Sequence, residues 1–231
     1  MIRLYTTLFL LTSVDGKIST GDTDIMDVDK DYSEIAGIKE GLKQYYDIQQ
    51  QTDLCSLITG KVLEKIGINK KTDEPIKTPL TFIVVDNIPH LNEGGVVYLA
   101  KQLTRLIIVT NNKSHPAFLV KNDYLNIEVI FYNDKIDFND LFEILRKDYG
   151  IERVTVQSGG TLNSLLIREG LIDRVLLVVA PALIGGSNTA TLMDGDSLHT
   201  PSDIFKIKTL ELIQAKSLED SYLLLEYKVN N

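Results

Sequence analysis

Cysteine is nearly absent from the 231-residue sequence, which contains only Cys55. A single thiol cannot form an intramolecular disulfide, so the sequence lacks the composition of a disulfide-stabilised secreted protein. The three histidines, His90, His115 and His199, are far apart and share no metal-ligand spacing with Cys55. The sequence therefore predicts no metal site.

Long apolar runs and an excess of basic charge are also missing. The apolar run near the N-terminus is much shorter than a membrane span, and it ends in Ser-Val-Asp-Gly rather than in a small-residue cleavage site. The 24 basic and 32 acidic residues give a net charge of −8, whereas nucleic-acid binding requires a basic face. We therefore expect a cytoplasmic protein that has neither a membrane nor a nucleic acid as a partner.

Apolar, β-branched segments alternate with amphipathic segments along most of the chain. Seven segments have the composition of buried strands: 3–11, 54–59, 80–86, 105–110, 127–132, 153–158 and 174–181. Helical spacing occurs at 29–51, 94–103, 137–150 and 161–170. Asp137 or Asn139 lies near the N-cap of the third of these helices, and Gly150 and Gly170 stand at helix ends.

This alternation predicts an α/β fold with three layers, in which helices cover a mostly parallel, mixed central sheet. The segment 205–229 breaks the pattern, because it contains two strand-like runs joined by a polar turn. It predicts a C-terminal antiparallel hairpin at a sheet edge. No segment is long or biased enough to be a linker, so we expect one domain over residues 1–231.

Two Gly-Gly pairs flank an apolar run in the segment 157–186. The first pair, Gly159 and Gly160, follows a predicted strand and precedes a predicted helix. Glycines at such a junction let a phosphate approach the backbone at a helix N-terminus, although a tight turn without a ligand is equally compatible with them. The spacing is not that of a standard Rossmann fingerprint.

Polar loops follow three other predicted strands. Asp15 and Lys17 follow the first strand, where they would line a ligand cleft or lie in a plain solvated turn. Residues 59–61 lead from a strand into a helix, as a phosphate site or only as a capped helix start. Residues 110–113 offer donors to a nucleotide 2′-phosphate, or form only a solvated loop.

In combination, these segments resemble the RibD C-terminal reductase family, whose fold is that of dihydrofolate reductase. The resemblance covers essentially the whole chain. The segments that carry it are 11–19, 56–62, Gly-Gly-Thr-Leu-Asn at 159–163, Gly-Leu-Ile-Asp-Arg at 170–174 and Ala-Pro-Ala-Leu-Ile-Gly-Gly at 180–186.

The resemblance implies a reductase that uses NADPH to transfer hydride to a small substrate. The implied activity is most similar to that of 5-amino-6-(5-phosphoribosylamino)uracil reductase of riboflavin biosynthesis, which opens a ribose to a ribityl chain. The implied contacts of the NADPH pyrophosphate are Gly159, Gly160, Thr161 and Leu162, with Thr59 and Gly60 beside them. The implied contacts of the 2′-phosphate are Thr110, Asn111 and Lys113.

The resemblance also implies a substrate site on the loop after the first strand. Its residues would be Ser13, Asp15, Gly16 and Lys17. Asp15 is the candidate catalytic residue, for substrate orientation or for proton relay. Pro181, Gly185 and Gly186 would shape the floor of the cleft. Family members are commonly dimers, so we expect a homodimer in which the apolar hairpin edge serves as an interface.

The sequence departs from the family pattern at two places. The riboflavin enzymes typically have a Trp-Ile pair after the Asp-Gly loop, whereas this sequence has no tryptophan. They typically bind the substrate phosphate with arginines, whereas the segment 59–71 of this sequence offers Lys65, Lys70 and Lys71 but no arginine, and lysine lacks the bidentate guanidinium. Two alternatives therefore remain: a reductase of the same fold for a pterin or another small carbonyl or imine substrate, or a protein that binds NADPH without catalysis.

Overall fold

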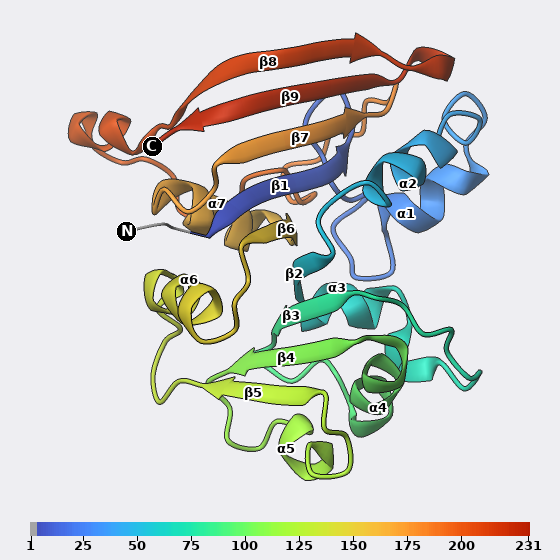
Figure 1. Cartoon of the computed structure of the whole chain (residues 1–231). Helices are drawn as coiled ribbons and strands as arrows, with labels where there is room; N and C mark the ends of the chain where they lie inside the picture. Colours follow the sequence, from blue (N-terminus) through green and yellow to red (C-terminus); the bar gives the residue numbers. More distant parts are fainter. Residues whose placement is uncertain (1–3) are drawn as a thin grey trace. The chain divides into compact units, whose positions relative to one another are not determined.

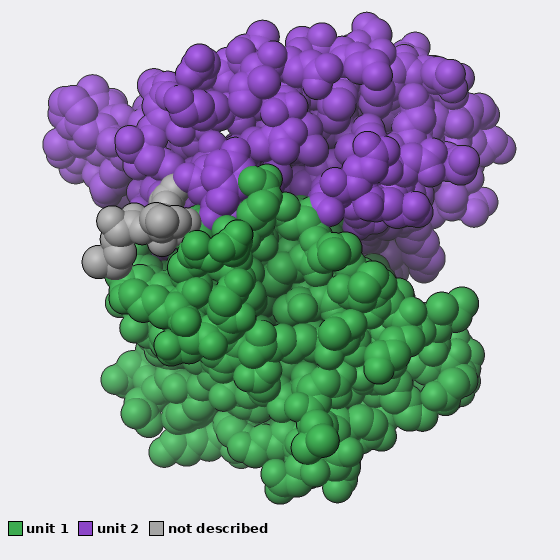
Figure 2. Space-filling view, in the orientation of Figure 1, with its two compact units in different colours: residues 1–4, 53–158 green, residues 5–52, 159–231 purple. Residues whose placement is uncertain are grey.

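The computed structural model describes residues 4–231 and divides them into two compact units. Unit 1 contains Leu4 and residues 53–158, and unit 2 contains residues 5–52 and 159–231 (Figure 2). Arg3, at which the first strand is expected to begin, lies outside the described residues. The expectation of one domain over residues 1–231 remains a prediction.

Unit 1 is built on a parallel sheet (Figure 1). Its strand order is β5-β4-β3-β2-β6. The strands are β2 (Cys55–Thr59), β3 (Thr81–Val85), β4 (Arg105–Thr110), β5 (Ile127–Phe131) and β6 (Arg153–Gln157). The sequence predicts all five, because parallel strands that are buried on both faces have continuous apolar runs.

Helices cover the sheet of unit 1. They are α3 (Gly60–Lys65), η2 (Ile68–Lys70), α4 (Glu93–Gln102), α5 (Ala117–Val120) and α6 (Phe138–Lys147). Apolar side chains of α3, α4 and α5 form one core with Ile58, Val84 and Ile108. Asp137, one of the two predicted candidates, caps α6 by accepting hydrogen bonds from the backbone N–H groups of Asn139 and Asp140.

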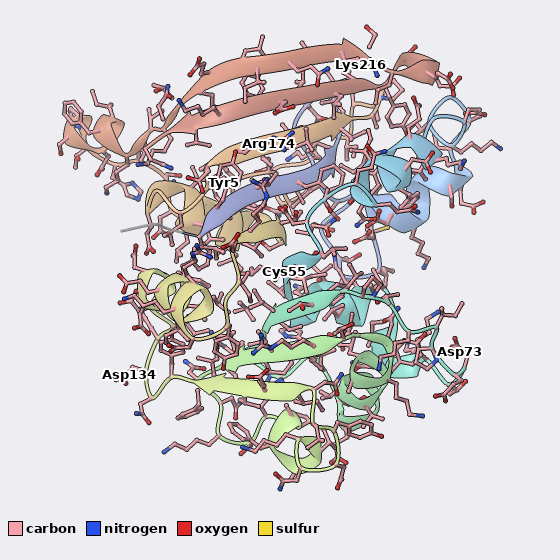
Figure 3. The ribbon with its side chains drawn as sticks, viewed as in Figure 1. Tyr5, Cys55, Asp73, Asp134, Arg174 and Lys216 are labelled. Carbon is pink, nitrogen blue, oxygen red and sulfur yellow. The ribbon has the colours of Figure 1, made fainter. Side chains whose placement is uncertain are left out.

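Side chains that alternate with this core on the strands are also buried. Leu57, Ile83 and Ile107 point to the opposite face of the sheet and have no exposed surface. Both faces of the sheet are therefore covered, as a layered α/β fold requires. Cys55, labelled in Figure 3, is buried at the start of β2, and burial raises the pKa of its thiol to about 12.

Unit 2 contains parallel and antiparallel strands. Its strands are β1 (Tyr5–Thr12), β7 (Arg174–Val179), β8 (Thr209–Ser217) and β9 (Leu223–Asn230). β1 pairs with β7 in parallel, whereas β9 pairs antiparallel with both β7 and β8. The predicted C-terminal hairpin is therefore confirmed, as is the mixed α/β class with mostly parallel pairing.

The helices of unit 2 are short. They are α1 (Val28–Asp31), η1 (Tyr32–Glu34), α2 (Lys43–Gln49), α7 (Gly160–Arg168), η3 (Pro201–Lys206) and η4 (Glu219–Ser221). The prediction of one continuous helix over 29–51 is wrong. Ile35 is extended, and Gly37 has a φ of +87°, a left-handed conformation that interrupts a helix. Within residues 4–231, no helix has the length and apolarity needed to cross a membrane.

Candidate active site

The loop after β1 is organised around Asp15. Its carboxylate accepts hydrogen bonds from the Ser13 hydroxyl at 2.6 Å and from the backbone N–H groups of Ile184 at 3.1 Å and Gly185 at 2.6 Å. The bond from Ser13, followed by the bond from Gly185, lowers the pKa of Asp15 to about 2. Asp15 is therefore ionised near neutral pH, and it can accept hydrogen bonds but is a poor source of a proton.

The second Gly-Gly pair gives this loop its shape. Gly185 and Gly186 have φ values of +74° and +83°, which place both residues in the left-handed region that glycine tolerates. The Lys17 ammonium donates to the carbonyls of Gly186 at 2.7 Å and Thr189 at 2.9 Å. Lys17 is largely buried and thus ties the loop after β1 to the segment after β7.

The first Gly-Gly pair begins α7, as predicted. A Cβ at Gly160 would lie 2.3 Å from both the Thr191 carbonyl and the Asp194 carboxylate, so a side chain here would displace residues 191–194. At Gly159, by contrast, no atom of the described residues other than Gly159 and its two chain neighbours lies within 4 Å of a Cβ position. Gly160 thus serves close packing within the chain, whereas the backbone of Gly159 is open to approach.

Residues 191–194 connect the predicted site residues of unit 2. The Leu192 N–H donates to the Gly16 carbonyl at 3.0 Å, and the Asp194 N–H donates to the Gly160 carbonyl at 3.0 Å. The Asn163 side chain donates to the Leu192 carbonyl at 2.9 Å. Unit 2 therefore brings residues 13–17 and 159–163 together through a connector that we did not predict, although its Asp-Gly pair at 194–195 is a turn signal.

The predicted site residues of unit 1 lie at the carboxyl ends of β2 and β4, which both flank β3. Thr59 accepts from the Val62 N–H at 3.4 Å and caps α3, which is the plainer of the two interpretations that we gave for this segment. The Thr110 hydroxyl donates to the Asp86 carbonyl at 2.8 Å, and the Asn111 N–H donates to the Asn87 side chain at 3.1 Å. Lys113 is exposed.

Asp86 follows β3 at the same edge of the sheet and accepts hydrogen bonds from side chains and backbone groups around it. Its side chain has no exposed surface and accepts from His115 Nε2 at 3.1 Å and His90 Nδ1 at 3.0 Å. The backbone N–H groups of His90 and Leu91 also donate to it, each at 3.1 Å. A Cβ at Gly60 would lie 2.2 Å from the Asp86 carboxyl carbon, so Asp86 also explains this glycine.

Our sequence reasoning missed Asp86 and its two histidines. His90 and His115 have no metal-type spacing, and their shared acceptor becomes visible only when β3 and β4 are side by side. Asp86 alone could have been found, because a carboxylate that directly follows a buried strand is a common site residue of parallel sheets. Among residues 4–231, no group of three or more potential ligands could hold a metal ion.

Known proteins resemble the chain, and one relative matches nearly its whole length. A model of the RibD C-terminal domain matches residues 4–224. The 2,5-diamino-6-ribosylamino-4(3H)-pyrimidinone 5′-phosphate reductase of Methanothermobacter thermautotrophicus is 28% identical over 232 residues, which cover 99% of each chain. The reductase of the same name from Aquifex aeolicus is 30% identical over 129 residues, 54% of each chain.

Solved structures share the fold at low sequence identity. Acinetobacter baumannii RibD matches 99% of this chain and 59% of its own longer chain, with a TM-score of 0.67 and 15% identity. Dihydrofolate reductase from Enterococcus faecalis matches 98% of this chain and 97% of its own, with a TM-score of 0.51 and 10% identity. The dihydrofolate-reductase-like fold is therefore confirmed, and the match over residues 4–224 shows that the chain belongs to the RibD C-terminal domain family.

Proposed function

We propose that this protein is a cytoplasmic reductase of riboflavin biosynthesis that transfers hydride from NADPH to a small, phosphorylated ribosylaminopyrimidine. The observation that carries the proposal is the alignment with the Methanothermobacter reductase, because it covers 99% of both chains. The polar loops after β2 and β4 in unit 1, and the loop after β1 in unit 2, support it, since each follows the carboxyl end of a strand, where ligands of open α/β sheets bind.

Two substrates are candidates, and they differ in one group of the pyrimidine ring. The family resemblance in the sequence favours 5-amino-6-(5-phosphoribosylamino)uracil. A Thermotoga maritima protein that shares the fold is named a diaminohydroxyphosphoribosylaminopyrimidine deaminase and 5-amino-6-(5-phosphoribosylamino)uracil reductase. The relatives from Methanothermobacter and Aquifex are named for the 2,5-diamino pyrimidinone, which has an amino group in place of a carbonyl. The near-full-length relative favours the diamino ring.

We propose that the start of α7 in unit 2 holds the NADPH pyrophosphate. When bound, NADPH supplies the hydride. The residues that fit are Gly159, whose backbone is open to approach, and Gly160, Thr161 and Leu162 in the first turn of the nine-residue helix. The backbone N–H groups and the dipole at a helix N-terminus favour an anion there.

In unit 1, we propose Thr110, Asn111 and the exposed Lys113 as contacts of the 2′-phosphate. A lysine ammonium and neighbouring polar groups provide charge-assisted hydrogen bonds to a phosphate. We propose Thr59 and Gly60 as flanking residues rather than main phosphate contacts, because the Asp86 carboxylate occupies the space beside Gly60.

The loop after β1 is the proposed substrate site. The ionised Asp15 accepts three hydrogen bonds within the chain and has one acceptor position left, on Oδ2, for an amino or ring N–H group of a pyrimidine; this favours substrate orientation over proton relay. Ser13 and Gly16 shape the loop. Lys17 already donates to two carbonyls, so its proposed role is to fix the loop beside the substrate.

Titration and turnover of the purified protein test this proposal. We expect NADPH to bind much more tightly than NADH, and NADPH absorbance to fall when the diamino pyrimidinone phosphate is added. Faster turnover of 5-amino-6-(5-phosphoribosylamino)uracil would instead identify that compound as the substrate. Binding without turnover of either compound would favour a non-catalytic NADPH-binding protein, and turnover of a pterin alone would favour another reductase of this fold.

We further propose a homodimer that forms through the C-terminal hairpin. Every residue of β8 is exposed, including Leu210, Leu212 and Ile213. Phe205 in η3 is also largely exposed. An uncovered apolar edge strand promotes aggregation unless another chain pairs with it. Sedimentation should give a dimer for the wild type and a monomer for Leu212→Lys, and a monomeric wild type would contradict the proposal.

A further inference from the structure

We infer that Asp86 and His115 are positioning residues that hold residues 110–117 in the conformation required by the 2′-phosphate of NADPH, without touching the cofactor. This inference rests on the proposed function. It adds a role for buried residues that lie behind the exposed Lys113.

The network connects the end of β3 to the segment after β4. The Asp86 carboxylate accepts from His115 Nε2 at 3.1 Å, and the Asp86 carbonyl accepts from the Thr110 hydroxyl at 2.8 Å. Asp86 therefore contacts both ends of the segment that contains Lys113. Asp86, Thr110 and His115 are all buried, so these bonds are shielded from competing water.

Within the segment, each bend has its own hydrogen bond. The Asn112 N–H donates to the Thr110 hydroxyl at 3.1 Å, the Ser114 N–H donates to the Asn112 side chain at 2.8 Å, and the His115 N–H donates to the Asn112 carbonyl at 3.2 Å. Lys113 thus lies between two residues whose backbone N–H groups are fixed. Its exposed side chain extends from a backbone that the buried network holds in place.

His115 is oriented from both sides of its ring. Its Nδ1 atom accepts from the Ala117 N–H at 3.1 Å, so the proton lies on Nε2 and is donated to Asp86. Burial alone would raise the pKa of Asp86, but the hydrogen bonds from His115 and His90 outweigh it and lower that pKa. The carboxylate therefore remains charged, and its bonds to the histidines are charge-assisted.

The test compares His115→Leu with His115→Gln. Leucine fills the buried space without a donor, whereas glutamine retains an N–H group that can reach Asp86. Calorimetric titration measures the dissociation constants of NADPH and NADH for each protein. Amide exchange of the cofactor-free protein reports on the Asn112 and Ser114 N–H groups. Asp86→Asn serves as a second variant if His115→Leu fails to fold.

We expect His115→Leu to weaken NADPH binding about tenfold, the effect of one charge-assisted hydrogen bond. NADH binding should change less than about threefold, because NADH has no 2′-phosphate to be positioned. The Asn112 and Ser114 amides should exchange faster, kcat at saturating NADPH should be unchanged, and His115→Gln should recover most of the affinity.

Two outcomes would overturn the inference alone. One is wild-type binding of NADPH together with unchanged affinity in folded His115→Leu. The other is an equal loss for NADPH and NADH, which would assign the network a general structural role. A wild type that binds neither nucleotide would instead refute the proposed function, and this inference with it.

Discussion

Unit 1 and unit 2 both fix the loops at their strand ends with a carboxylate, but the two carboxylates lie in opposite environments. Asp86 in unit 1 is fully buried between two histidines, and burial opposes its ionisation. Asp15 in unit 2 is exposed and accepts from a serine hydroxyl and two backbone N–H groups. A buried carboxylate links loop geometry to global stability, whereas an exposed one can be altered without unfolding the protein.

The largest expected difference between the units comes from removing each carboxylate. Asp86→Ala should lower the free energy of unfolding by about 3 kcal/mol or more, because the buried Leu91 N–H and His115 Nε2 lose their acceptor. Asp15→Ala should leave the urea midpoint nearly unchanged while it reduces turnover. If Asp86→Ala and Asp15→Ala shifted the midpoint of urea unfolding equally, the proposed difference between the buried and the exposed carboxylate would be wrong.

Glycine substitutions sharpen the same comparison. Gly60→Ala forces a Cβ against the buried Asp86 carboxyl group and should cost about 2–3 kcal/mol of unfolding free energy. Gly160→Ala should cost less, about 1–2 kcal/mol, because residues 191–194 are only partly buried and can shift. Gly159→Ala, where the space is open, is the control for folding. The interpretation fails if Gly160→Ala is the more damaging change by thermal or urea unfolding.

The pKa values of Asp15 and Asp86 are lowered, whereas the pKa of Asp29 in unit 2 is raised, so its effect on stability has the opposite dependence on pH. Burial, followed by the charge of Asp27, raises its pKa from 3.8 to about 6. Between these values the native state binds a proton that the unfolded state does not, so the free energy of unfolding should rise as the pH falls from neutral to about 5. Asp29→Asn should remove this rise and increase the free energy of unfolding near neutral pH by about 2 kcal/mol. Unfolding curves recorded at several pH values provide the check, and an unchanged pH dependence in the variant would be the contrary result.

The smallest expected effect concerns the exposed side of unit 1. Lys113→Ala should leave stability unchanged and weaken NADPH binding by about tenfold more than NADH binding, since one charge-assisted contact is lost. Lys135→Ala, another exposed lysine of unit 1, is the matched control. Equal losses for the two nucleotides in calorimetric titration would remove Lys113 from the proposed 2′-phosphate site.

Strands were easier to predict than the connections between site residues. Each strand of unit 1 is a continuous apolar run, because a parallel sheet is buried on both faces. The helix expected at 29–51 has apolar residues at helical spacing, but the left-handed Gly37 and the extended Ile35 interrupt it. Tertiary structure therefore overrode a periodic pattern in this segment.

The hydrogen-bond network around Asp86 was not predictable for a different reason. Asp86 and His115 are 29 positions apart, and only the pairing of β3 with β4 brings them to one edge. The loop residues themselves, such as Asp15 and Gly160, could be named from turn chemistry and family resemblance. The contacts that hold these loop residues in place, such as those made by residues 191–194, are backbone contacts, and no short sequence motif encodes them.

The most direct measurement follows the hydride itself. NADPH deuterated at C4 of the nicotinamide, on the face that is transferred, is incubated with the protein and the 2,5-diamino pyrimidinone phosphate, and the product is analysed by mass spectrometry and NMR. The proposed function predicts a ribitylamino product that carries one deuterium at C1′, the sugar carbon that stays bonded to the amino nitrogen on the pyrimidine while its bond to the ribose ring oxygen is broken. Recovery of unreacted substrate, although the protein binds NADPH, would contradict it.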